Sequence, residues 1–216
     1  MVQRIAGLVC LVILGGCAHS DGPSPAPIEP AGSSWSSGTD APMGRTEVTA
    51  TRLGRDVYVV GGFVPEGDET TARVDVYSIE DDEWSSGPDL PVAINHAMSA
   101  TVAGRAYLIG GFRGPGLSNA TRRAYVLSGD AWKAIRPMPA RRAAGAAVGL
   151  DGRIYVVGGV TGDGLAPKTL VYNPRRDRWS RRPGLHVPRH HLGLARSGGK
   201  LYAVAGREQG GGNLDA

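Results

Sequence analysis

The sequence predicts an all-β protein made of repeated four-stranded antiparallel units, and three spacings lead to this prediction. An apolar strand that ends in two glycines recurs at residues 57–62, 106–111 and 154–159, with a degenerate copy at 201–206. The tryptophans follow one another at steps of 49, 48 and 47 residues, at Trp35, Trp84, Trp132 and Trp179. A tyrosine stands seven residues before each of the last three, at Tyr77, Tyr125 and Tyr172. A period near 48 residues with rigid internal spacing is typical of stacked supersecondary units.

Each unit contains four predicted strands. The first is small and apolar, at 96–102, 143–150 and 191–197, and the second is the glycine-pair motif. The third carries the second tyrosine, and the fourth carries the tryptophan. Glycine-containing turn signals separate the first two strands. Length varies only between the opening tyrosine and the second tyrosine (19, 18 and 17 residues), so one loop of variable length follows each glycine pair.

These glycine pairs and tyrosine–tryptophan pairs resemble the kelch repeat of β-propellers, over about residues 34–216. The resemblance implies four-stranded blades around a central channel. The fourth unit has only its first two strands, because residues 207–216 end the sequence before a third strand. We therefore expect a propeller, truncated at its C-terminus, of about three full blades plus partial ones in an incomplete ring.

The N-terminus predicts an export signal. Arg4 precedes an apolar run at residues 5–14, which makes only about 15 Å of helix, too short to span a bilayer. The run ends in Leu-Gly-Gly-Cys at 14–17, which resembles a bacterial lipobox. We expect residues 1–17 to be a lipoprotein signal peptide with Cys17 as the lipidated residue, and the protein to be anchored to a membrane of the cell envelope. An ordinary secretory signal that contains a cysteine is the alternative.

Residues 18–33, rich in Pro, Ser and Gly, are predicted to be a tether.

Several chemistries find no support in the sequence. Cys10 and Cys17 are the only cysteines, so the body offers neither a disulfide nor a thiolate site. The adjacent His190 and His191 would point to opposite faces of a strand, which does not favour chelation of one metal. We expect no metal and no cofactor. The net charge of +4 comes from 21 arginines and 3 lysines against 20 acidic residues, and we expect no nucleic-acid partner.

The candidate ligand-binding residues follow from the register. Ten residues past successive tryptophans stand Arg45, Ile94, Arg142 and Arg189. Two residues further on stand Glu47, His96, Ala144 and His191. In kelch proteins an arginine at the first place often lines the channel mouth, and guanidinium groups suit carboxylates, sulfates or phosphates. By this resemblance the predicted ligand-binding set is Arg45, Arg142, Arg189, Arg113, Arg207, His96 and His191. The alternatives are that the arginines bind carbonyls inside the blade junctions and that the histidines are ordinary strand-start residues.

The sequence favours a non-catalytic binding module over an enzyme without deciding between them. The module would recognise a protein or an anionic glycan on the face that carries the variable loops. Further blades or a partner chain would close the ring. The alternative is a carbohydrate-active kelch enzyme such as an isomerase similar to sialic-acid mutarotases, for which Glu47 is the only carboxylate at an inner strand start. A copper oxidase resembling galactose oxidase needs a body cysteine, which is missing.

Overall fold

The computed structural model describes residues 36–64, 69–114 and 117–210. The chain divides into two compact units, Met1–Ser37 and Gly38–Ala216, and the description below concerns the second. The predicted signal peptide, the tether and Trp35 lie outside the described residues. Among the residues that are described, there is no helix that could cross a membrane.

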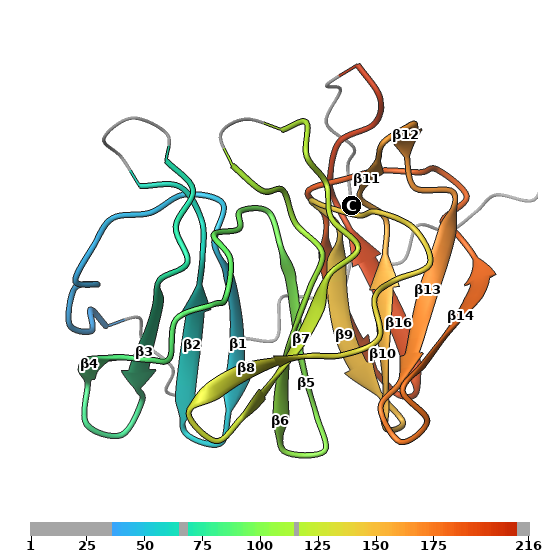
Figure 1. The fold of residues 1–216 in the computed structure, drawn as a ribbon. Coiled ribbons are helices and arrows are strands. Elements are labelled where there is room, and N and C mark those ends of the chain that lie inside the picture. The colour runs from blue at the N-terminus through green and yellow to red at the C-terminus, as the bar shows by residue number, and fades with distance from the viewer. Residues whose placement is uncertain (1–35, 65–68, 115–116, 211–216) are drawn as a thin grey trace, which may run out of the picture. The chain divides into compact units, whose positions relative to one another are not determined.

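Three four-stranded antiparallel sheets and a final two-stranded sheet follow one another along the chain (Figure 1), and a second, short two-stranded sheet lies within one connecting loop. The first blade contains β1 (Thr49–Leu53), β2 (Asp56–Val60), β3 (Val74–Ser78) and β4 (Glu83–Ser86). The second contains β5 (Met98–Val102), β6 (Arg105–Ile109), β7 (Ala124–Ser128) and β8 (Ala131–Ala134). The third contains β9 (Ala146–Leu150), β10 (Arg153–Val157), β13 (Lys168–Asn173) and β14 (Arg178–Pro183). The fourth contains β15 (Gly193–Ser197) and β16 (Lys200–Val204). The predicted strands and the prediction of about three full blades plus a partial one are confirmed.

The inner strands β1, β5, β9 and β15 pack against one another in that order. Most of their side chains are small, which lets neighbouring strands approach closely. Short polar contacts add to this packing. The Thr49 and Ser99 hydroxyl oxygens lie 2.7 Å apart, and the Thr51 and Thr101 hydroxyl oxygens 2.9 Å apart. The blades are therefore joined along their inner edges by both packing and hydrogen bonds.

The hydrophobic core lies between the blades, where facing sheets bury their apolar side chains against each other. One cluster joins the first two blades and includes Val60, Leu108 and Trp132. A second joins the second and third blades and includes Ile109 and Tyr172. A single blade has no core of its own, so its strands depend on the blades at either side.

The glycine pairs are the points where successive blades meet. The N–H of the second glycine donates to a carbonyl of the next blade: Gly62 to Ile94 at 2.9 Å, and Gly111 to Arg142 at 2.8 Å. The first glycine of each pair lies against the same carbonyl. A Cβ on Gly110, whose φ is +64°, would stand 2.2 Å from the Arg142 carbonyl oxygen. Only glycine combines this backbone conformation with so close an approach.

The tryptophans link the outer edges of successive blades. Each indole N–H donates to a carbonyl about one repeat earlier: Trp84 to Thr39, Trp132 to Pro88 and Trp179 to Arg136, at 2.8–2.9 Å. This contact explains the constant spacing of the tryptophans. It recurs in each of the three four-stranded blades and holds the outer strand to the segment before it.

The variable loops lie at one end of the blades, as predicted. They connect β2 to β3, β6 to β7, and β10 to β13, and the last of them contains the short pair β11 (Val160–Thr161) and β12 (Gly164–Leu165). Backbone bridges tie each of these loops to the segment before an inner strand, at Thr46–Phe63, Asn95–Phe112 and Ala143–Val160, and the equivalent bridge after β16 is His190–Arg207. Figure 1 shows these loops at the top of the view, opposite the β3–β4 and β13–β14 turns.

Substitution of Gly110 tests the close contact between blades. We expect Gly110→Ala to lower the free energy of unfolding by at least about 2 kcal/mol, because the new methyl group meets the Arg142 carbonyl. Gly104 is the matched control, since it has a φ of +69° but no atom within 4 Å of its Cβ position. Gly104→Ala should lower the free energy of unfolding by only about 1 kcal/mol, because alanine disfavours the positive φ angle but meets no neighbouring atom. Equal losses in chemical denaturation would contradict the proposed contact.

Candidate functional site

A hollow of about 450 Å³ opens at the loop-bearing end of the blades. It is lined by Thr46, Glu47, Phe63, His96, Leu117, His190, His191 and Arg207. These residues come from the first, second and fourth repeats, so blade packing brings together positions that are far apart in the sequence. The hollow combines one carboxylate, three imidazoles and one guanidinium with aromatic and aliphatic walls.

The backbone holds four equivalent residues in the left-handed conformation just before the inner strands. Their φ angles are 53° at Glu47, 51° at His96, 52° at Ala144 and 51° at His191. A chain of hydrogen bonds joins them: the N–H groups of His96, Ala144 and His191 donate to the carbonyls of Glu47, His96 and Ala144 respectively, at 2.8–3.0 Å. Non-glycine residues adopt this conformation at a cost of about 1–2 kcal/mol, which the hydrogen bonds between blades offset.

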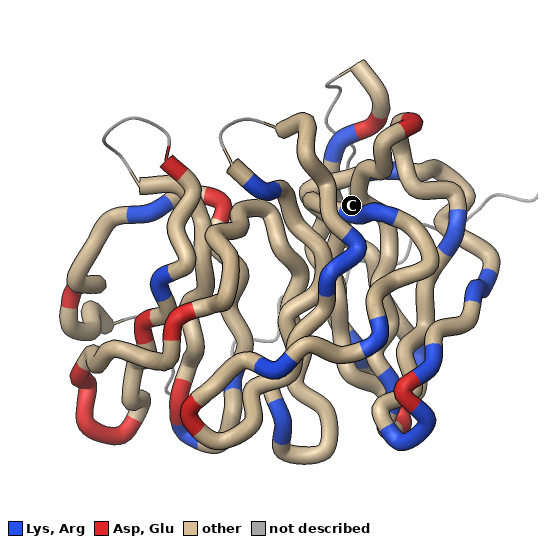
Figure 2. Tube along the Cα trace, viewed as in Figure 1, with Lys and Arg blue, Asp and Glu red and all other residues tan. Residues whose placement is uncertain are grey.

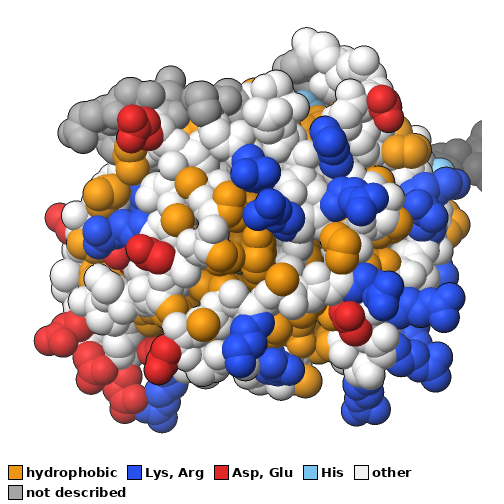
Figure 3. Space-filling model, in the orientation of Figure 1, with side chains coloured by type: hydrophobic (Ala, Val, Ile, Leu, Met, Phe, Trp, Pro, Cys, Tyr) orange, Lys and Arg blue, Asp and Glu red, His pale blue; other side chains and the backbone are white. Residues whose placement is uncertain are grey.

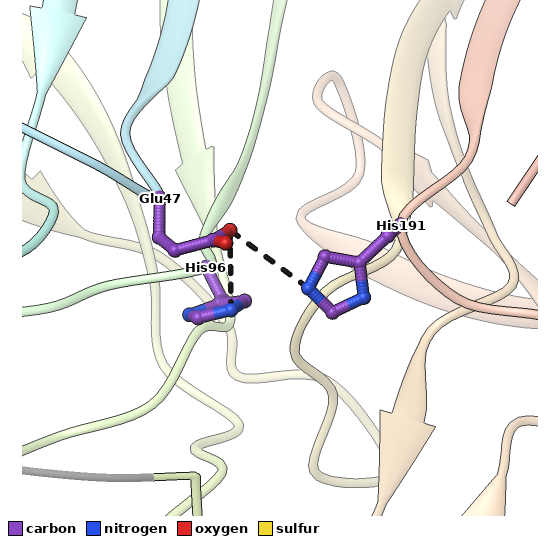
Figure 4. A group of neighbouring side chains, drawn as sticks. All are labelled: Glu47, His96 and His191. Atoms are coloured by element: carbon purple, nitrogen blue, oxygen red, sulfur yellow. Dashed lines mark ion pairs between the residues drawn. The ribbon is translucent and has the colours of Figure 1, made fainter. Parts of the chain in front are cut away.

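Glu47, His96 and His191 point toward one another (Figure 4). The Glu47 Oε2 atom lies 3.1 Å from His96 Nε2 and 3.8 Å from His191 Nε2. The two rings are nearly perpendicular, with centroids 5.1 Å apart. His96 is almost fully buried between the edges of Phe63 and Phe112, whereas the Glu47 side chain is 40% exposed. One carboxylate and two imidazole nitrogens therefore converge at an opening to solvent.

Burial lowers the pKa of both histidines. For His96 desolvation is the largest cause, Glu47 opposes it, and His190 adds to it. For His191 desolvation is again the largest, opposed by Glu47 and reinforced by His96 and Arg207. Both shifts favour the neutral ring, the form in which imidazole serves as a base or as a metal ligand.

Arg45, one of the predicted ligand-binding arginines, does not line the hollow. Its guanidinium is buried, and Nη1 donates to the carbonyls of Gly61 and Arg73, both at 3.0 Å. Its Nη2 donates to the buried Asp75 carboxylate. Burial lowers the pKa of Arg45, and Asp75 opposes that shift. The group ties the glycine-pair turn to the third strand of its own blade.

Arg142 and Arg189 show the same inward orientation. Arg142 is 1% exposed, and its Nη1 donates to the Gly158 carbonyl at 3.1 Å and the Lys168 carbonyl at 2.9 Å. Burial lowers its pKa to about 10, and Leu170 stands where the first blade has Asp75. Arg189 donates to the Ala203 carbonyl at 3.1 Å. The inward position has a physical reason: the arginine stem is long enough to cross beneath the turn and reach backbone carbonyls of its own blade.

The other predicted residues divide into two groups. His96, His191 and Arg207 line the hollow together, and Arg207 is exposed there. Arg113 is also exposed, on the β6–β7 loop, but it does not line the hollow. Three of the seven predicted residues therefore lie together at one opening. Glu47 and His190 belong to the same group and carried too little sequence signal to be included.

A separate charged region lies at the other end of the blades. The β3–β4 turn is acidic and the β13–β14 turn is basic (Figure 2), and Figure 3 shows these charges at opposite sides of one face. A hollow of about 360 Å³ on the third blade is lined in part by Arg153, Arg176, Arg178 and Arg182. This arginine-lined hollow is a second place where an anion could bind.

The four-stranded sheets, their blade-to-blade packing and the opening at their inner ends define an incomplete β-propeller. Comparison with protein families finds two Kelch motifs, at residues 44–91 and 141–186. They coincide with the first and third blades, and the second blade repeats the same strand register between them. The all-β architecture and these two motifs together fit a partial β-propeller built from kelch repeats. No curated protein matches it.

Substitution of Arg142 distinguishes a structural from a ligand-facing arginine. We expect Arg142→Met to lower the free energy of unfolding by roughly 2–4 kcal/mol, because two buried carbonyls lose their donor. The neighbouring exposed Arg141 is the matched control, and Arg141→Met should change stability by less than about 0.5 kcal/mol. A stability in urea that is unchanged for Arg142→Met would show that the guanidinium serves no structural role.

Proposed function

We propose that the protein is a non-catalytic binding module that recognises a protein or an anionic glycan at its loop-bearing end. Kelch repeats are themselves indicative of a protein-binding propeller. The observation that carries the proposal is the hollow at that end, where Arg207 lies beside two imidazoles and the loops of variable length begin. Loops on a rigid repeat are where binding residues concentrate, and a guanidinium favours carboxylate, sulfate or phosphate groups.

The second element of the proposal is attachment to the bacterial cell envelope. Its support is the apolar run at 5–14 followed by Leu-Gly-Gly-Cys at 14–17. Lipid on Cys17 and a Pro-rich tether at 18–33 would hold the propeller away from the membrane, with its binding end free.

Catalysis is the second candidate function, favoured by the position of Glu47. Its carboxylate lies 3.1 Å from the His96 ring at an open hollow, which suits proton transfer to and from a sugar. An isomerase similar to sialic-acid mutarotases would need no more than such groups. An NMR assay of ring opening on purified protein separates the two functions, because a binding module leaves the exchange rate of the sugar unchanged.

A further proposal concerns the fourth blade. Tyr202 and Val204 of β16 are 47% and 43% exposed, whereas Tyr107 and Ile109, at the same register in β6, are 3% and 0% exposed. Exposed apolar side chains on a two-stranded sheet favour contact with another strand or blade. We propose that further blades or a partner chain cover this sheet and complete the ring.

Substitution of Arg207 tests the binding end. With sulfated and sialylated oligosaccharides as probes, we expect affinity to fall about tenfold in Arg207→Ala and to weaken with salt. Arg176→Ala, in the basic β13–β14 turn, is the matched control and should bind as the wild type does. A larger loss in Arg176→Ala would move the site to the arginine-lined hollow of the third blade. Absence of binding to all these probes would remove the anionic-glycan part of the proposal.

Metabolic labelling tests the anchor. In a bacterial host, labelled palmitate should enter the wild-type protein and should be missing from Cys17→Ala, because that thiol is the proposed acceptor. Cys10→Ala, which removes a cysteine inside the apolar run, should retain the label. Equal labelling of the wild type and Cys17→Ala would refute lipidation at this residue.

A further inference from the structure

We propose that Glu47, His96 and His191 form a binding site for a divalent transition-metal ion such as zinc. The candidate ligand atoms of the three side chains all lie within 4.8 Å of one another. This inference does not depend on the proposed function, because it concerns the metal alone. Four observations carry it: the tautomer of His96, the partner of His191, the distances between the donor atoms, and the open side of the site.

The hydrogen bonds around His96 determine which of its nitrogens is free. The Asn95 Nδ2 atom donates to Thr70 Oγ1 at 2.8 Å and lies 3.3 Å from the Gly114 carbonyl, which can only accept. The Asn95 Oδ1 atom therefore faces His96 Nδ1 at 2.7 Å, and it can only accept. It follows that His96 Nδ1 carries the hydrogen, so the neutral ring directs the lone pair of Nε2 toward Glu47.

His191 is oriented in a similar way by the residue before it. Its Nδ1 atom hydrogen-bonds to His190 Nδ1, which leaves Nε2 as the nitrogen that faces Glu47. Each of the two imidazoles is thus held through Nδ1 by its neighbour in the sequence, Asn95 or His190. Metal-binding histidines are commonly oriented in this manner, with one nitrogen on a polar partner and the other on the ion.

The lone pairs of Glu47 and His96 that converge need a positive species between them. The Glu47 Oε2 atom and the His96 Nε2 atom, 3.1 Å apart, are both acceptors when the ring is neutral, so a proton or a cation has to lie between them. A single proton can join only two of the three atoms. A metal ion can bind all three, and it leaves both imidazoles neutral.

The distances suit metal–ligand bonds of about 2.1 Å. Two donors at that bond length are separated by about 3.0 Å at a right angle and about 3.4 Å at a tetrahedral angle. The observed separations from Glu47 Oε2, 3.1 Å and 3.8 Å, lie on either side of the tetrahedral value. Two imidazoles and one carboxylate favour zinc and similar ions over calcium or magnesium, which prefer oxygen ligands.

The site has an open side. Glu47 is 40% exposed and His191 is 24% exposed, so water or a ligand could take the remaining coordination position from the hollow. Ala144, the fourth residue of the same register, provides no ligand. Arg207 lines the hollow and is the charged group that opposes a cation there. With an ion bound, the same guanidinium would favour an anionic atom at the open position.

Calorimetric titration of the purified full-length chain with zinc tests the proposal. We expect one zinc ion per chain, and an affinity at least about tenfold weaker in Glu47→Gln and in His191→Ala. His186, which is exposed and outside the cluster, provides the matched control, and His186→Ala should bind zinc as the wild type does. Calcium in large excess should not displace zinc.

A second measurement separates loss of the site from loss of the fold. Zinc should raise the melting temperature of the wild type and of His186→Ala, but not that of Glu47→Gln, which should melt at the same temperature as metal-free wild type. Cobalt in place of zinc should give a visible absorption spectrum that is missing from Glu47→Gln. Failure of the wild type to bind zinc, or equal weakening in His186→Ala, would overturn the proposal and leave only a shared proton at Glu47.

Discussion

The contact on which this fold depends is the docking of one backbone carbonyl on the glycine pair of the preceding blade. Gly62 and Gly111 donate to Ile94 and Arg142, and the first glycine of each pair leaves no room for a Cβ. This contact sets how closely the blades approach at the loop-bearing end. The tryptophan bonds at the outer strands and the apolar clusters between sheets then hold the same pair of blades along the rest of their length. Because each blade buries its faces only against neighbours, stability is shared between repeats.

The same docking creates the candidate site. Two residues after the docked carbonyl, the chain enters the left-handed conformation at His96 and His191, as it does at Glu47. The hydrogen-bonded backbone chain through these positions directs their side chains into one hollow. The arginines that stand two residues earlier in the repeat extend to the other side of the turn. There Arg142 donates hydrogen bonds to two carbonyls of its own blade. Positions whose side chains point into the blade and positions whose side chains line the hollow therefore lie within a few residues of each other, and the left-handed backbone conformation between them separates the two directions.

Arginines at equivalent positions in different blades differ in whether a carboxylate compensates their charge. Arg45 meets the buried carboxylate of Asp75, so its charge is compensated. Arg142 meets only carbonyls, since Leu170 occupies the matching position, and burial lowers its pKa to about 10. Ile94 replaces the arginine altogether in the second blade and joins an apolar cluster there. The position beneath the turn can therefore hold an arginine with a carboxylate partner, an arginine with only carbonyl partners, or an apolar side chain. The docking of the backbone carbonyl on the glycine pair is kept in the last two cases.

The sequence alone determined the strands, their order and the loop-bearing end, because these follow from local patterns: alternation, turn glycines and the constant interval between Tyr125 and Trp132. It also identified His96 and His191 as equivalent positions. Only the tertiary structure decided which side chains meet. A guanidinium can reach several ångströms in either direction, so the register of Arg142 does not reveal whether it faces carbonyls or solvent. The approach of Glu47 to both histidines depends on the angle between successive blades, which no spacing within a repeat records, and this is why the carboxylate–imidazole cluster was found only in the folded chain.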